Sequence, residues 1–160
     1  MKTVKLLSIL GCMLFLTTAS TCHHDDDDDS SSFSNNQVAI AAVNTTMLQG
    51  NWRITYYFDT DHDATVQFST YTFTFGAGNV LTASNGNNTY TGSWIVTNSN
   101  SSNDDNPDSD VDFNIAFSNS AGFAELTDDW EIVSRTANRI ELIDISGGNG
   151  GTDHLVFEKN

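Results

Sequence analysis

The sequence contains two cysteines and one proline in 160 residues. Both cysteines, Cys12 and Cys22, precede the aromatic-rich body of the chain, so that body has no thiol for a disulfide, a thiolate metal site or redox chemistry. Basic residues are also scarce: six Lys and Arg stand against 21 Asp and Glu, a formal net charge of −15. Because such a chain repels the phosphate backbone, nucleic-acid binding is excluded.

The chain is also poor in catalytic arrangements. Its body contains His62, His154 and Lys159, and no Ser or Thr lies in a recognisable nucleophile motif. Carboxylate pairs such as Asp128 with Asp129, or Glu141 with Asp144, occur, and charges on strand faces or helix ends explain them most simply. We therefore predict that the protein is not an enzyme and has no catalytic residue.

The N-terminus has the pattern of an export signal. Lys2 and Lys5 precede an apolar stretch from 6 to 16 that is too short to span a bilayer. The segment Thr17-Thr18-Ala19-Ser20-Thr21-Cys22 resembles the lipobox of bacterial lipoproteins. This resemblance implies a signal peptide over 1–21 and a lipid anchor on Cys22, with Cys12 as the competing lipidation site.

An acidic tether follows the predicted anchor. His23-His24 leads into five consecutive aspartates, 25–29, and three serines. This run resembles the signal that sends some lipoproteins to the outer face of the outer membrane, while a solvated linker is the alternative. We predict disorder over 23–36, a short helix over 38–47 that completes a lead-in segment (22–47), and no resident cofactor.

From residue 48 to 160 the sequence predicts one all-β domain. Apolar and polar residues alternate in short runs that Gly, Asn, Asp and Ser clusters separate, and Asn85-Gly86 is typical of a tight hairpin turn. One or two helical turns are expected within 120–128. Eight strands are predicted, over 52–58, 71–75, 80–84, 90–96, 111–117, 130–134, 139–145 and 154–159.

Eight strands in hairpin order favour an antiparallel up-and-down barrel, which removes its own sheet edges, and a β-sandwich is the alternative. Leu48-Gln49-Gly50-Asn51-Trp52, Gly92-Ser93-Trp94 and the closing segment 155–159 resemble the lipocalin-like domains of secreted bacterial lipoproteins. The resemblance implies that Trp52 closes one end of the barrel beneath Arg139 or Arg135.

A ligand site is predicted from the apolar face of the strands. On the first strand this face holds Trp52, Ile54, Tyr56 and Phe58, with Tyr57 on the other face. Large inward aromatics indicate either a packed core or a small aromatic pocket at one mouth. The predicted lining joins broad apolar surfaces to polar groups: Tyr56, Tyr90, Trp94 and Trp130.

Two acidic segments are candidates for a cation. Asp59, Asp61 and Asp63 alternate after the first strand, a spacing that can turn several oxygens toward Ca²⁺, although the glycine and distal glutamate of an EF-hand are missing. The run from 103 to 112 is similarly acidic but matches no ligand template. Solvated loops are the simpler interpretation, and weak calcium binding is the alternative.

Together these observations predict a surface-anchored outer-membrane lipoprotein with a lipocalin-like barrel that binds a small apolar or aromatic ligand. The alternative is a non-enzymatic scaffold with a filled barrel, which binds surface proteins or glycans through its loops. The size of the interior space separates the two hypotheses.

Overall fold

The computed structural model describes residues 29–99, 111–118, 122–145 and 151–160, with side chains from residue 35 onward. The predicted signal peptide, Cys12, Cys22, the start of the tether and most of the acidic run 103–112 lie outside the described residues. The elements, in chain order, are α1 (Asp29–Met47), β1 (Trp52–Asp59), β2 (His62–Asp63), α2 (Thr65–Phe68), β3 (Thr72–Gly76), β4 (Val80–Ser84), β5 (Thr89–Asn98), β6 (Val111–Ala116), the 3₁₀ turn η1 (Ala124–Leu126), β7 (Asp128–Arg135), β8 (Arg139–Ile145) and β9 (Thr152–Lys159).

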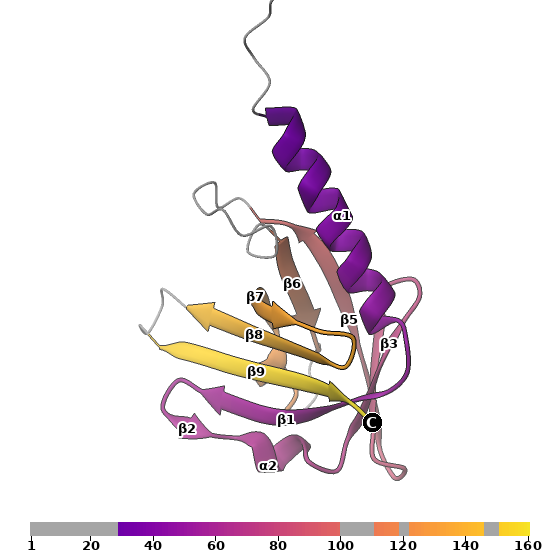
Figure 1. Cartoon of the computed structure of the whole chain (residues 1–160). Coiled ribbons are helices and arrows are strands. Elements are labelled where there is room, and N and C mark those ends of the chain that lie inside the picture. Colours follow the sequence, from indigo (N-terminus) through magenta and orange to yellow (C-terminus); the bar gives the residue numbers. More distant parts are fainter. Residues whose placement is uncertain (1–28, 100–110, 119–121, 146–150) are drawn as a thin grey trace, which may run out of the picture.

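The sheet closes on itself. Antiparallel neighbours run in the order β1-β3-β4-β5-β6-β7-β8-β9, and β9 pairs back onto β1 from Trp52↔Lys159 to Phe58↔His154. The short β2 lies outside this ring, on the edge of β1. The predicted eight-stranded up-and-down barrel is therefore confirmed, and the β-sandwich alternative is wrong (Figure 1).

The helical predictions needed correction. Residues 29–36 were expected to be disordered, but they form the first half of α1, which is 19 residues long. The turn predicted within 120–128 is confirmed as the single turn of η1. The sequence did not indicate α2, which begins where the Asp63 carboxylate accepts a hydrogen bond from the Thr65 N–H.

A β-bulge in β1 changes which side chains point inward. Ile54 pairs with Phe157, but the next pair along the ladder is Tyr56↔Val156, so one extra residue stands in β1. Beyond the bulge the faces exchange: Tyr57 is fully buried, whereas Tyr56 is 41% exposed on the outside. The predicted inward orientation of Tyr56 and outward orientation of Tyr57 were therefore both wrong.

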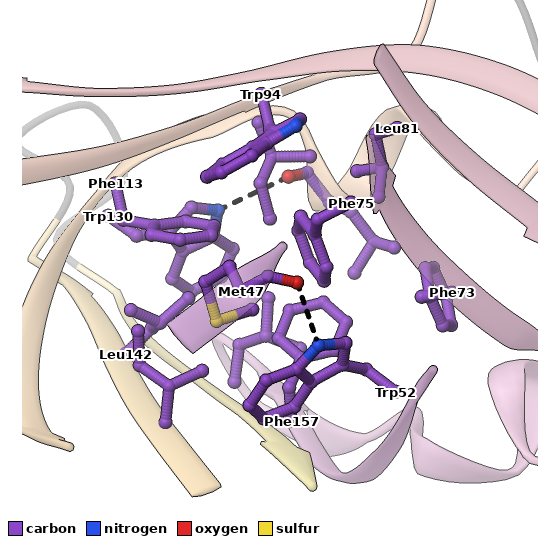
Figure 2. Close-up of a cluster of buried hydrophobic side chains, with 14 of the residues drawn as sticks. Met47, Trp52, Phe73, Phe75, Leu81, Trp94, Phe113, Trp130, Leu142 and Phe157 are labelled. Carbon is purple, nitrogen blue, oxygen red and sulfur yellow. Dashed lines mark hydrogen bonds between the residues drawn. The ribbon is translucent and has the colours of Figure 1, made fainter. Parts of the chain in front are cut away.

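Helix α1 covers one end of the barrel, which we call the helix mouth, where β1 begins and β9 ends. Ala39, Val43 and Met47 recur every four residues and form its buried stripe. The Trp52 indole N–H donates to the Met47 carbonyl at 3.1 Å (Figure 2). In Figure 1, α1 leans against β5 and its N-terminal end points away from the strands.

The cation expected over Trp52 comes from a different residue. The Lys159 Nζ lies 5.1 Å from the centre of the Trp52 ring and donates to the Ala137 carbonyl. Arg139 precedes the inward-facing Ile140 and points outward, where it pairs with Glu141 at 2.7 Å and Glu158 at 3.7 Å. Because the side chains of a strand alternate, the expected contact of Arg139 with Trp52 was wrong.

Aromatic side chains fill the middle of the barrel. The Phe75 ring contacts Trp52, Trp94, Phe113 and Phe157, at centroid distances from 5.3 to 6.4 Å and interplanar angles from 74° to 88°. Such edge-to-face contacts pair the positive edge of one ring with the negative face of another. Figure 2 shows these side chains converging from several strands on the barrel axis.

Gly92 of β5 leaves room for Ala116 and Phe117 at the end of the neighbouring strand β6. A Cβ atom at this position would lie 2.8 Å from Phe117 Cδ1 and closer still to the Ala116 carbonyl oxygen.

We expect Gly92→Ala to lower the free energy of unfolding by about 1–3 kcal/mol, since the backbone of β6 has to move. Urea unfolding followed by tryptophan fluorescence measures this, with Thr91→Ala on the exposed face as the control. Equal stability of the two variants would contradict the close contact.

Candidate functional site

The end of the barrel opposite α1, which we call the loop mouth, gathers polar and aromatic groups that face the barrel axis. It is formed where β1, β4, β6 and β8 end and where β3, β5, β7 and β9 begin. Its rim has two halves of different chemistry. Strands β3, β5 and β6 carry aromatic residues there, and β7, β8 and β9 carry aspartates.

The aromatic half surrounds a single ring. Phe123, which immediately precedes η1, is buried with its ring near those of five residues that we call the aromatic box. The five centroid distances lie between 4.6 and 6.2 Å, and the box consists of Phe68, Tyr71, Phe73, Tyr90 and Phe117. Phe123 thus occupies a site lined on several sides by rings.

Two tyrosines form the outer edge of this box. Tyr71 and Tyr90 are half-buried, and their rings lie 5.9 Å apart. Desolvation, and then the neighbouring Tyr90 hydroxyl, raises the pKa of Tyr71. The Tyr71 phenol is therefore neutral at physiological pH and can both donate and accept hydrogen bonds at the rim.

The acidic half places three aspartates on the inward side of their strands. Asp128 shares a face with the buried Trp130, and Asp144 lies directly opposite Asp153 across the β8–β9 ladder. Each of Asp128, Asp129 and Asp144 offers a carboxylate oxygen within 4.8 Å of the others. The residues could therefore share a cation, although like charges this close also oppose folding when no cation is bound.

Burial and mutual repulsion perturb these carboxylates. Burial, followed by the charges of Asp128 and Asp153, raises the pKa of Asp144 to about 6. Within the described part of the chain, the buried Oδ2 of Asp144 has no hydrogen-bond partner. Burial also raises the pKa of Asp128. The Asp153 carboxylate, in contrast, has hydrogen-bond partners. Its Oδ1 accepts the backbone N–H of Thr60 at 2.6 Å and the Thr60 hydroxyl at 3.1 Å.

The structure separates the four residues that we predicted to line one pocket. Tyr90 belongs to the aromatic box, while Tyr56 lies outside the barrel. Trp94 and Trp130 are buried in the packed interior, where their indole N–H groups donate to the carbonyls of Gly76 and Leu126. For Tyr90, Trp94 and Trp130, strand alternation predicted the inward direction of the side chain but not the different heights along the barrel.

Two of the three aspartates that were predicted to bind a cation in the first loop interact with residues next to them in the sequence. The Asp61 carboxylate pairs with the His62 ring at 3.0 Å, and the Asp63 carboxylate accepts the N–H of Thr65 at 2.9 Å. Among the described residues, the carboxylates that converge are instead those of Asp128, Asp129 and Asp144. Weak calcium binding through Asp59, Asp61 and Asp63 stays a prediction. Glu141 and Asp144, paired in the sequence, face opposite sides of the wall.

Sequence reasoning missed three residues of this mouth. Tyr57 turns inward because of the bulge and donates its hydroxyl to the Glu125 carbonyl at 2.8 Å. Phe68 belongs to the unexpected α2, and Phe123 to the segment between two strands. A run of apolar residues at helical spacing, Phe123 and Leu126, was the one available signal for this segment.

Comparison with family models, with curated proteins and with solved structures found no match to this chain. Within the described residues, no helix combines the length and the hydropathy needed to cross a membrane.

Asp144 makes the stability of the barrel depend on pH. Because its pKa is about 6 in the folded state and its ordinary value is 3.8, folding favours the protonated form, and this stabilisation is lost as pH rises from about 4 through 6. We expect Asp144→Asn to flatten this part of the pH profile and to raise the urea midpoint at pH 7.5. The exposed carboxylate of Asp61 provides the control, Asp61→Asn. A lower midpoint for Asp144→Asn at pH 7.5 would refute the assignment.

Proposed function

We propose that this chain is a non-enzymatic binding protein, attached to the bacterial outer membrane through a lipid on Cys22, whose lipocalin-like barrel holds a small aromatic ligand at the loop mouth. The observation that carries the proposal is the aromatic box, with two tyrosines at its edge. Apolar walls with a few polar groups at the rim are typical of small-molecule sites.

The packed interior supports a site at the mouth rather than deep in the barrel. Trp52, Trp130 and Phe113 are fully buried and in contact with other core side chains. An eight-stranded barrel has room for its own side chains or for one small ligand. With the centre filled, the loop mouth is the part of the barrel at which we propose that a ligand about the size of one ring binds.

The position of α1 supports an outward-facing loop mouth. The helix leaves the barrel at the opposite mouth, and 19 residues of helix span about 28 Å. A lipid on Cys22, seven residues before Asp29, would therefore be connected to the barrel through α1, which meets the barrel at the mouth opposite the aromatic box. Such an attachment leaves the loop mouth accessible to solutes.

The second candidate is a scaffold with a filled barrel that binds other surface molecules through its exterior. The exposed Tyr56 on the outer wall favours this function, because tyrosine is enriched in protein interfaces. Under this hypothesis the aromatic box is part of the hydrophobic core and binds no ligand.

Lipid attachment can be tested by metabolic labelling in a Gram-negative host. We expect the full chain to incorporate labelled fatty acid, Cys22→Ser to lose the label, and Cys12→Ser to retain it. The thiol of the lipobox cysteine is the group that carries the diacylglyceryl chain, which a serine hydroxyl does not replace. Label retained by Cys22→Ser and lost by Cys12→Ser would move the anchor to the earlier cysteine.

Native mass spectrometry of the full chain, released gently from the membrane, separates the two functions. A ligand carrier is expected to show a reproducible added mass beyond the lipid, equal to one small molecule for each chain. The matched control is Tyr90→Ala, which removes one wall of the box and should lower the occupied fraction. A single mass for both proteins would favour the scaffold.

A further inference from the structure

The aromatic box already contains a ring of the chain itself. Phe123 contacts Tyr90 in a tilted arrangement at 4.6 Å and Tyr71 edge-to-face at 5.0 Å. Phe117 closes a third side at 5.1 Å, and Phe68 a fourth at 5.3 Å. The box is therefore sized and lined for one six-membered aromatic ring.

The backbone after Phe123 is held firmly. Leu126 is fully buried, and its carbonyl accepts the Trp130 indole N–H at 3.2 Å. The neighbouring Glu125 carbonyl accepts the Tyr57 hydroxyl at 2.8 Å. Two buried side chains thus fix η1 in place without contributing to the box.

The backbone before Phe123 has a different character. Gly122 is exposed and adopts a φ of +85°, a conformation that other residues rarely take. Among the described residues, a Cβ atom there would contact the Gln67 side chain alone, at the ordinary van der Waals distance of 3.8 Å. The Phe123 carbonyl accepts the Leu126 N–H at 3.1 Å, so the side chain leaves the box through the torsions of Phe123 itself while this hydrogen bond is kept. The torsions of Gly122 can absorb the resulting change in chain direction.

We propose that Phe123 is a built-in substitute for the ligand and acts as a gate: its ring leaves the box when the ring of a small phenol enters. This inference rests on the proposed function and specifies its ligand class. The walls suit an uncharged aromatic ring, and the hydroxyls of Tyr71 and Tyr90 at the rim can hydrogen-bond a phenolic hydroxyl. The guest repeats the ring contacts that Phe123 gives up.

In this proposal, competition with the Phe123 ring sets the apparent affinity of the box for its ligand. A ligand that binds only when the gate is open has its dissociation constant raised by the inverse of the open fraction. Shortening residue 123 therefore tightens binding even though no contact with the ligand is added. A purely structural Phe123 predicts instead that the wild-type protein does not bind the probe at all.

The probe is p-cresol, the side-chain analogue of tyrosine, added to the full-length protein. Calorimetry gives the affinity, and nuclear Overhauser effects from the p-cresol methyl group to the rings of Tyr71 and Tyr90 identify the site. We expect wild-type binding at millimolar p-cresol and at least tenfold tighter binding by Phe123→Ala. The Overhauser effects should persist in both proteins.

Gly122→Ala tests the gate without altering the box. An alanine at positive φ disfavours the closed backbone by about 1–2 kcal/mol, which corresponds to about 5- to 30-fold tighter p-cresol binding. This variant also serves if Phe123→Ala fails to fold. Glu125→Ala is the control, because it removes an exposed side chain of the same segment outside the box and should leave the Overhauser effects and the affinity of the box unchanged.

Two results overturn the gate. One is p-cresol binding by Phe123→Ala with no Overhauser effect in the wild-type protein at 10 mM probe, which makes Phe123 a fixed core residue. The other is equal affinity of the wild-type protein, Phe123→Ala and Gly122→Ala. Failure of the proposed function alone is distinguishable: there, native mass spectrometry shows no added mass, while the wild-type protein still binds p-cresol in the box and Phe123→Ala binds it more tightly.

Discussion

The pairing of β1 with β9 is the constraint on which the rest of the structure depends. It converts an open sheet into a closed wall, so every strand has one face toward a narrow interior. The aromatic side chains on that face have to pack against one another, as Phe75 does with its four neighbours. Closure also creates two ends that need cover, which α1 supplies at one mouth and Phe68 and Phe123 at the other.

The same ladder contains the irregularity that shapes the loop mouth. The extra residue between Ile54 and Tyr56 turns Tyr57 inward, where its hydroxyl holds η1 and its ring lies 5.6 Å from Phe68. Without the bulge, Tyr56 would occupy the interior instead and the segment that carries Phe123 would lose one of its two anchors. A local change in register thus positions an element 68 residues away in the sequence.

The sequence predicted the strands and the closed barrel well, because alternation and turn residues are local signals. It did not predict the candidate site, which depends on non-local geometry. Nothing in the pattern of residues 52–58 distinguishes a bulged strand from a regular one, and both Tyr56 and Tyr57 suit either face. Likewise, Lys159 rather than Arg139 covers Trp52 because of strand alternation at the helix mouth, which a resemblance in motif does not specify. The inward position of Phe123 was hardest to predict, because strand alternation says nothing about the direction of a side chain that lies between two strands.

A filled barrel and a ligand-binding barrel are usually treated as alternatives, and our proposal combines them at the loop mouth. Phe123 completes the core of the barrel in this structure. Under the proposed gate, the burial of that one ring sets a threshold that a ligand has to exceed, and a ring of similar shape recovers the same ring contacts. Across the rim, the repulsion between Asp144 and its acidic neighbours lowers the stability of the folded barrel at neutral pH. The two halves of the mouth therefore have opposite effects on stability: ring contacts in the aromatic half raise it, and charge repulsion in the acidic half lowers it.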